Sequence, residues 1–239
     1  MNGIRRRARV RLLAAAATAA LTLGFALPAG ASEPVRVMPL GDSITEGADG
    51  DATYRYFLWH DFLDGGYGVD FVGSMYGVKG RRAQPKYPDF DQDHEGHSGW
   101  TATKIGKYAY TFAVNADPDI VLLHAGTNDL LRGIAPSKIA GKLQKIIVQL
   151  RQANPQVAVF IAEIIPIRGM ESQVADLNSR IRTLAGQLNS ASSPVISVDQ
   201  FSGFDVNADL KTDGIHPTES GFVKMGDRWY QAVASYLNS

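Results

Sequence analysis

Short apolar runs alternate along the chain with segments of helical period. Five of the runs are apolar at almost every position, which is typical of strands that are covered on both faces. These runs are Val35–Leu40, Val69–Val72, Ile120–Leu123, Val157–Ile161 and Val195–Val198. Because strands that alternate with helices pair in one direction within a single sheet, the pattern predicts an α/β fold with a five-stranded parallel sheet.

Five segments between and after these runs have the spacing of amphipathic helices. The clearest is Ser137–Ala153, where apolar residues recur every three or four positions until Asn154 and Pro155 end the pattern. The others are Tyr54–Leu63, Thr101–Phe112, Glu171–Leu188 and Thr218–Leu237. One long irregular segment, Ser74–Gly99, interrupts the alternation. Since such loops are usually functional or mobile, we expect it to form a wall of a substrate site.

The first 31 residues differ from the rest in composition. Five arginines precede an apolar run, Leu12–Leu27, and the sequence A-G-A at 29–31 resembles the cleavage site of exported proteins. A membrane anchor needs about 18 apolar residues, whereas this run ends at Pro28 after roughly 16. We therefore interpret residues 1–31 as a secretory signal peptide. Residues 32–239 are then one domain, secreted to the extracellular space without stable membrane anchoring.

Charge and cysteine content narrow the function further. Five of the 24 basic residues leave with the signal peptide, so 19 remain against 24 acidic residues. Such a mildly acidic chain lacks the basic surface that binds nucleic acid. The chain has no cysteine, which excludes disulfides, zinc–thiolate sites and thiol nucleophiles. We expect a monomer with no nucleic-acid partner.

The motif G-D-S-I-T-E-G, residues 41–47, follows the first predicted strand. Asp42 and Ser43 at the start of a helical stretch could serve only as helix caps. Ligands of parallel sheets, however, bind beyond the carboxyl ends of the strands, which is where Ser43 should lie. Gly41 and Gly47 would permit a tight turn and a close approach by a substrate. From this motif alone, a cap and a nucleophile are equally good interpretations of Ser43.

A second motif, D-G-I-H-P at residues 213–217, places a carboxylate three residues before a histidine. A short turn could fold Asp213 onto the imidazole of His216. A serine hydroxyl becomes a good nucleophile when a neighbouring base takes its proton and a third group orients that base. Ser43, His216 and Asp213 have this chemistry, although a turn aspartate and a capping histidine would give the same short pattern.

Two further positions could stabilise an oxyanion. The motif G-T-N-D at 126–129 follows the third predicted strand, so the Asn128 amide should emerge at the same edge of the sheet. A fixed donor aimed at an oxyanion is worth about 3–4 kcal/mol of barrier; an Asx-turn is the alternative for Asn128. In G-H-S-G-W, residues 96–100, Gly99 could present its backbone amide to a substrate or form only a turn.

The segment 89–100 also permits other interpretations. Ser98 lacks the final glycine of a G-x-S-x-G nucleophile elbow, and the histidines of H-E-G-H are one residue too close for a zinc helix. The acids from Asp89 onward alternate as in a calcium loop, but His94 occupies the position of its glycine. We expect no metal site. The open alternative is an ion held by Asp91, Asp93, His94 or His97.

Three remaining polar residues have less informative surroundings. His60 lies in a predicted helix between Trp59 and Asp61, and we expect it to pack or to face solvent. His124 follows one predicted strand and Glu163 follows another. Each of these two is therefore either structural or close to the site.

Together the four motifs resemble those of the GDSL esterases, also called SGNH hydrolases after the Ser, Gly, Asn and His of their four blocks. The motifs occur in the family's order, and the resemblance covers nearly all of residues 32–239. D-F-V-G-S at 70–74 and D-H-E-G-H-S-G-W-T at 93–101 are similar to carbohydrate esterase family 3, which includes acetyl xylan esterases. The resemblance implies a three-layer αβα, flavodoxin-like sandwich, in agreement with the hydrophobic pattern.

The resemblance also implies a role for each residue. Ser43 would be the nucleophile, His216 the base and Asp213 its orienting partner, while Ser43, Gly99 and Asn128 would supply the oxyanion hole. The implied reaction is hydrolysis of short acyl esters, with acetyl groups on xylan or another polysaccharide as the leading substrate and with no cofactor. A lipase or phospholipase acting on lipid esters is the alternative. A non-catalytic carbohydrate-binding module would normally lack Ser43 or His216.

Overall fold

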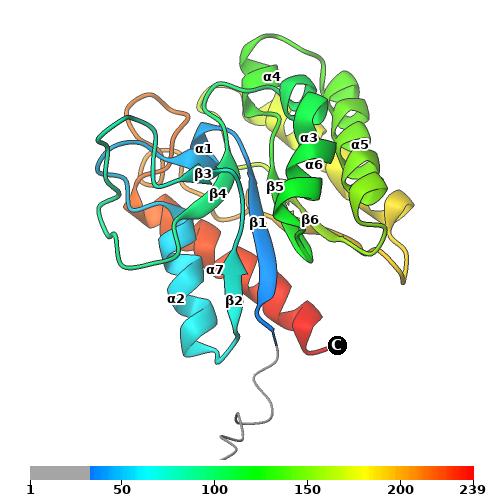
Figure 1. Ribbon diagram of the computed structural model, residues 1–239. Coiled ribbons are helices and arrows are strands. Elements are labelled where there is room, and N and C mark those ends of the chain that lie inside the picture. Colours follow the sequence, from blue (N-terminus) through cyan, green and yellow to red (C-terminus); the bar gives the residue numbers. More distant parts are fainter. Residues whose placement is uncertain (1–32) are drawn as a thin grey trace, which may run out of the picture. The chain divides into compact units, whose positions relative to one another are not determined.

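The computed structural model describes residues 33–239 (Figure 1). The predicted signal peptide, residues 1–31, lies outside the described residues and stays a prediction. Glu33–Ser239 form one compact unit. None of the helices in this part of the chain is both long enough and apolar enough to cross a membrane.

All five predicted strands are present, with ends that lie within two residues of the predicted ones. They are β1 (Val35–Gly41), β2 (Val69–Phe71), β5 (Ile120–His124), β6 (Ala158–Glu163) and β7 (Val195–Asp199). These strands pair in parallel, with β1 between β2 and β5 and with β6 and β7 following β5. The predicted α/β fold is confirmed.

Helices cover both faces of the sheet, which gives the three layers that the resemblance implied (Figure 1). One face is covered by α2 (Tyr54–Asp64) and α7 (Glu219–Leu237). The other is covered by α3 (Ala102–Ala116), α5 (Pro136–Ala153) and α6 (Glu171–Leu188). These are the five predicted helices, so the order of elements along the chain agrees with the hydrophobic pattern.

The strand β5 shows why its sequence is apolar at every position up to Leu123. Successive side chains of a strand point to opposite faces of the sheet. Val121 and Leu123 belong to the core beneath α3, α5 and α6, whereas Ile120 and Leu122 belong to the core beneath α2 and α7. Every residue of β5 is buried. The continuous apolar run therefore follows from helices that pack on both sides of the strand.

The segment 74–99 is less irregular than predicted. It contains two short strands, β3 (Met75–Tyr76) and β4 (Asp93–Gly96), so that the sheet within residues 33–239 has seven strands instead of five. β4 is parallel to the end of β1, where Gly41 lies opposite Gly96. The hydrophobic pattern does not predict β4 because its sequence, D-H-E-G, is almost entirely polar.

A buried arginine on α2 fixes this segment against the rest of the domain. Arg55 is fully buried, and its guanidinium donates four hydrogen bonds of 2.5–3.1 Å to backbone carbonyl oxygens. The acceptors are Thr45, Glu46, Gly77 and Gln92. Burial lowers the pKa of Arg55 to about 10, so the group stays charged at neutral pH. One side chain thus ties the residues after β1 to two points of the segment 74–99.

Replacing Arg55 by methionine should destabilise the domain strongly. The change removes one donor from each of four carbonyl oxygens, of which the Gln92 oxygen keeps the Gly77 amide at 3.2 Å. Loss of the Arg55 donor at the other three costs about 1 kcal/mol each or more, so we expect the free energy of unfolding to fall by about 3 kcal/mol. Urea unfolding followed by circular dichroism measures the loss. The exposed Arg81→Met is the control and should change the free energy by less than about 0.5 kcal/mol. Equal stability of the two variants would contradict this role of Arg55.

Candidate active site

The candidate site lies at the carboxyl end of the sheet, beyond β1 and β5. The chain passes from β1 to β2 on one side of β1, and β5 lies on the other side. The segments that follow β1 and β5 therefore diverge, which is the usual position of a ligand in an open parallel sheet. Two one-turn helices follow these strands, α1 (Ser43–Glu46) after β1 and α4 (Thr127–Leu131) after β5. Each is too short for a hydrophobic pattern to reveal.

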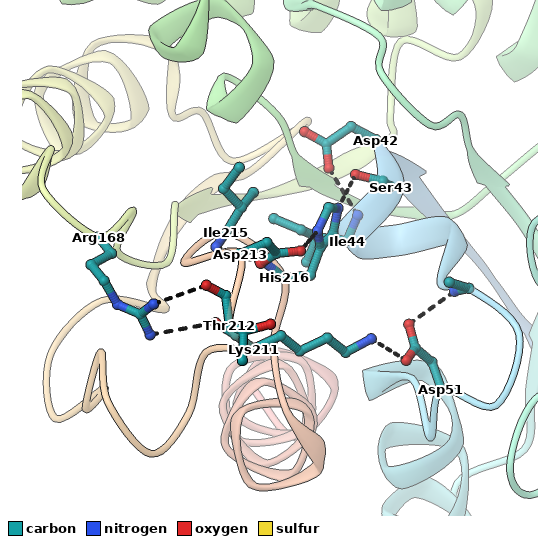
Figure 2. Close-up of polar contacts among 11 residues, drawn as sticks. Asp42, Ser43, Ile44, Asp51, Arg168, Lys211, Thr212, Asp213, Ile215 and His216 are labelled. Atoms are coloured by element: carbon teal, nitrogen blue, oxygen red, sulfur yellow. Dashed lines mark hydrogen bonds and ion pairs between the residues drawn. The ribbon is translucent and has the colours of Figure 1, made fainter.

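Ser43, His216 and Asp213 form a continuous hydrogen-bonded chain (Figure 2). The Ser43 Oγ lies 2.8 Å from Nε2 of His216, and the His216 Nδ1 lies 2.7 Å from Oδ2 of Asp213. With Nδ1 donating to the carboxylate, Nε2 is free to accept the serine proton. This arrangement of hydroxyl, imidazole and carboxylate is the one that activates a serine for nucleophilic attack.

Asp213 is held ionised by its own loop. Partial burial acts to raise its pKa, but hydrogen bonds from the amide and ring of His216 and from the Ile215 amide outweigh burial and lower the pKa below its usual value. The Asp213 Oδ1 accepts both amides, at 2.9 Å from Ile215 and 3.0 Å from His216. The short turn therefore fixes the carboxylate against the imidazole, as the D-x-x-H spacing predicts.

The turn that carries Ser43 requires glycine before it. A Cβ on Gly41 would lie 2.4 Å from Oγ1 of Thr45 and 2.5 Å from the carbonyl oxygen of His124, distances that no side chain tolerates. Asp42 caps α1 by accepting the Ile44 amide at 3.1 Å. The cap interpretation is therefore right for Asp42, whereas the Ser43 hydroxyl faces His216.

One cavity of about 420 Å³ is lined by all five residues that the sequence suggests for the triad and the oxyanion hole. Ser43, Gly99, Asn128, Asp213 and His216 line it. Within the described residues, the backbone amides of Ser43 and Gly99 donate to no other group. Both amides, together with the Asn128 side chain, are thus available to a ligand oxygen. Of the segment 74–99, which we expected to form a wall, Lys79 and Ser98 also line the cavity.

Asp42 has a second contact that sequence reasoning missed. Its Oδ2 accepts a hydrogen bond of 3.2 Å from the Asn128 side-chain amide, which fixes the amide with its nitrogen toward α1. Asp42 is fully buried, and burial raises its pKa to about 6 despite the hydrogen bonds from Ile44 and Asn128 and the nearby His216. The only sequence feature that could have indicated this contact is the position of Asp42 directly before Ser43, and a helix cap already accounts for an aspartate at that position.

Glu46 makes the corresponding contact at the other end of α1. Its Oε2 accepts the Ser98 amide at 2.7 Å and also contacts the Ser98 hydroxyl. Ser98 is thereby engaged by a carboxylate, and within residues 33–239 its hydroxyl makes no hydrogen bond to a histidine, unlike that of Ser43. The same contact fixes the loop that presents Gly99, whose φ of +76° is readily adopted only by glycine.

The acidic segment around residue 91 uses its side chains within the fold. Asp91 accepts the Phe71 amide at 2.8 Å. His94 is buried, accepts the Gly96 amide at 2.9 Å, and has its pKa held well below the usual value by burial. His97 contacts Glu95 and stacks on Trp100. Within residues 33–239, no three His, Asp or Glu side chains gather as metal ligands would.

The three remaining polar residues, His60, His124 and Glu163, make contacts that belong to the fold. His124 is fully buried, accepts the Ile165 amide at 3.4 Å, and has its pKa lowered to about 4 by burial. Glu163 accepts the Ser197 hydroxyl at 2.8 Å and pairs with Arg182. His60 contacts the Asp89 carbonyl oxygen at 3.1 Å. None of the three lines the cavity.

The chain matches known proteins over most of its length. The model of the GDSL-like lipase/acylhydrolase family matches residues 40–223, a range that includes the whole site. A multidomain esterase from Ruminococcus flavefaciens is 29% identical over 87% of this chain, and the chain spans only 30% of that protein's length.

Solved structures show the same similarity. An acetyl esterase mutant crystallised with an acetate ion is 32% identical, with a TM-score of 0.76, and the match covers 85% of this chain and 98% of that one. A carbohydrate esterase family 3 protein from Talaromyces cellulolyticus is 33% identical, with the same TM-score and coverage. The resemblance drawn from the four sequence motifs is confirmed. The chain belongs to the GDSL-like lipase/acylhydrolase family, a family of carboxylic ester hydrolases.

Proposed function

We propose that this protein is a secreted serine esterase that removes short acyl groups, chiefly acetyl, from a carbohydrate. The observation that carries the proposal is the chain of contacts from Ser43 through His216 to Asp213, at 2.8 and 2.7 Å, on the wall of a cavity that also contains Gly99 and Asn128. Hydroxyl, base, orienting carboxylate and oxyanion donors are the complete set that acyl transfer needs.

In the first half of the proposed reaction, Nε2 of His216 takes the hydroxyl proton while the Ser43 Oγ attacks the ester carbonyl carbon. The carbonyl oxygen becomes an oxyanion and accepts hydrogen bonds from the amides of Ser43 and Gly99 and from the Asn128 side chain. The carboxylate of Asp213 stabilises the imidazolium. His216 then protonates the leaving alcohol oxygen, and an acyl-enzyme remains on Ser43.

The second half repeats this chemistry with water. His216 takes a proton from the water, the hydroxide attacks the acyl carbon, and the same three donors bind the new oxyanion. Collapse of this intermediate breaks the bond to Oγ, and the serine regains its proton from His216. Because side chains and backbone amides supply every step, the proposed reaction uses no cofactor.

The choice of an acetylated carbohydrate rests on the rim of the cavity and on the relatives. Charged side chains, Asp51, Lys79 and Lys211, line the cavity beside the proposed nucleophile, and such a rim suits a polar alcohol better than a lipid. The two solved proteins compared above are an acetyl esterase and a family 3 carbohydrate esterase. Xylan is the leading polysaccharide for a first assay.

Secretion is part of the proposal because residues 1–31 have the arginine cluster, apolar run and A-G-A site of a signal peptide. N-terminal sequencing of protein recovered from the culture medium should start at Ser32. An intact leader on the exported protein would contradict the assignment.

Ser43→Ala and His216→Ala should each lower kcat by about 10³ or more, because the members of one catalytic unit act together. Hydrolysis of p-nitrophenyl acetate measures the loss, and circular dichroism checks that each variant is folded. Ser98→Ala is the matched comparison within the same cavity. Loss of turnover in Ser98→Ala, with activity retained in folded Ser43→Ala, would refute the proposed nucleophile.

Asp42→Asn should lower kcat by about 10²–10³ with little change in KM, since it disturbs a donor that acts on the transition state. Asparagine has a single acceptor oxygen, which the Ile44 amide occupies, so its NH₂ group would face the NH₂ group of Asn128. The Asn128 amide would then turn its oxygen toward residue 42 and withdraw its donor from the substrate. A loss confined to KM would contradict this role of Asp42.

The same variant should gain stability at alkaline pH. Burial raises the folded pKa of Asp42 from 3.8 to about 6, so the ionised wild-type carboxylate costs stability above about pH 6, and the cost disappears as the carboxyl protonates toward pH 4. We expect Asp42→Asn to raise the free energy of unfolding by about 1–3 kcal/mol at pH 8 and by much less at pH 4. The exposed Asp64→Asn is the control. If Asp42→Asn changes the free energy of unfolding equally at pH 4 and pH 8, the ionised Asp42 carboxylate is not the source of the cost.

Short acyl chains should be preferred. Each methylene that enters an apolar groove gains about 0.8 kcal/mol, so a lipase improves steeply with chain length. Here the charged side chains of Asp51, Lys79 and Lys211 line the cavity and would lose hydration beneath a long alkyl chain. In a p-nitrophenyl ester series, kcat/KM should be highest for acetyl or propionyl and should fall about tenfold by octanoyl. An optimum at eight carbons or more would favour the lipase alternative.

A further inference from the structure

The cavity wall beside His216 holds an ion pair that the proposed reaction does not use. Lys211 precedes the motif that carries Asp213 and His216, and its Nζ contacts Oδ1 of Asp51 (Figure 2). Asp51 lies in the loop that follows α1, so the pair joins the two segments that carry the base and the nucleophile. Both residues line the same cavity as Ser43.

The position of the pair relative to His216 is fixed by the backbone. The Lys211 amide donates to the carbonyl oxygen of His216 at 2.8 Å. Arg168 donates to the carbonyl oxygens of Lys211 and Thr212, at 3.4 and 3.2 Å. Figure 2 shows these two bonds on the side of the loop away from Asp51. Lys211 and His216 therefore belong to one hydrogen-bonded turn, which fixes the position of Lys211 relative to His216.

Asp51 is equally well fixed on the opposite side. Its side chain is only 10% exposed, and its Oδ2 accepts the Ala48 amide at 2.9 Å. The Lys211 side chain is 37% exposed and has three N–H donors, of which Asp51 occupies one. The pair therefore presents at least two unused donors, beside carboxylate oxygens whose lone pairs are not all occupied.

The chemistry of ester cleavage decides which part of a substrate meets this pair. The leaving alcohol oxygen must lie close to Nε2 of His216 to receive its proton, while the carbonyl oxygen turns toward Gly99 and Asn128. The alcohol therefore occupies the His216 side of the cavity, where Lys211 and Asp51 lie. An alcohol without polar groups would cover the ion pair and leave its donors unsatisfied, whereas free hydroxyls would hydrogen-bond to it.

We propose that the Asp51–Lys211 ion pair is the alcohol subsite and that it selects esters whose alcohol carries a free hydroxyl next to the acylated oxygen, as in a partly acylated sugar. The Lys211 ammonium donates to that hydroxyl, and the hydroxyl donates in turn to the Asp51 carboxylate. This inference rests on the proposed function and adds the group that distinguishes a sugar ester from a simple ester.

The test compares two acetyl esters that differ only in the alcohol. Methyl 2-O-acetyl-β-xyloside has a free hydroxyl beside the ester, whereas p-nitrophenyl acetate has none. The measured quantity is the ratio of kcat/KM for the xyloside to kcat/KM for the aryl ester. In Lys211→Met this ratio should fall by about tenfold or more, as expected for the loss of a hydrogen bond to a charged group. The 3-O-methyl derivative of this xyloside has no hydroxyl hydrogen beside the ester. When it replaces the xyloside, the ratio should change much less in Lys211→Met.

A matched control is the Lys86–Glu219 pair, whose side chains are 47% and 44% exposed and which does not line the cavity. Lys86→Met should leave the ratio unchanged. Asp51→Asn is the second test variant. The asparagine side-chain oxygen can still accept the Ala48 amide, so this variant tests the inference even if Lys211→Met does not fold. In Asp51→Asn the ratio should fall as well.

Three outcomes separate the possibilities. A fall in the ratio in Lys211→Met or Asp51→Asn, with Lys86→Met unchanged, supports the subsite. An equal loss on both esters would show that the pair only braces the His216 loop and would overturn the inference. Absence of wild-type activity on p-nitrophenyl acetate would instead refute the proposed function on which the inference depends.

Discussion

Two buried carboxylates at the ends of α1 hold the parts of the site in place. Asp42 precedes the helix and accepts the side-chain amide of Asn128, while Glu46 ends the helix and accepts the amide of Ser98. The helix between them is a single turn that begins with Ser43. Since each carboxylate binds a different loop, the distances between Ser43 and the donors on both sides are set by this one turn.

The arrangement requires that charge be buried. Burial raises the pKa of Asp42 to about 6, so at neutral pH the fold contains a carboxylate whose ionisation it disfavours. The two apolar cores on either face of the sheet supply the stability that offsets this cost. In return the proposed oxyanion donors are oriented before a substrate arrives, which is the condition under which such hydrogen bonds would lower the barrier most. Arg55 also fixes α1, because its guanidinium donates hydrogen bonds to the carbonyl oxygens of Thr45 and Glu46.

The parts of the fold that could be predicted are those in which burial leaves a local pattern of apolar residues in the sequence. β5 is a continuous apolar run and α5 buries apolar residues at a helical period, and both lie where the pattern predicts them. β4 could not be predicted because it is held by pairing with β1, a contact between residues that lie about 55 positions apart along the chain, and not by its own hydrophobicity.

The same distinction applies to the site. Ser43, Gly99, Asn128, Asp213 and His216 lie in short motifs, and all five line one cavity. The contacts of Asp42 with Asn128 and of Asp51 with Lys211 join positions 86 and 160 residues apart. No local spacing encodes such pairs, because the sheet and not the neighbouring sequence brings them together. Sequence motifs thus point to the proposed reacting groups, while the structure is needed to find the side chains that contact and orient them.

The central claim is that Ser43 is activated by His216, and covalent labelling tests it most directly. A fluorophosphonate reacts with an activated serine and mimics the first half of the proposed reaction. After incubation with the probe, peptide mass mapping should find one equivalent of label on the peptide that contains Ser43, with esterase activity lost in proportion, and His216→Ala should not be labelled. Label on a peptide containing another serine, or full esterase activity with Ser43 labelled, would contradict the account.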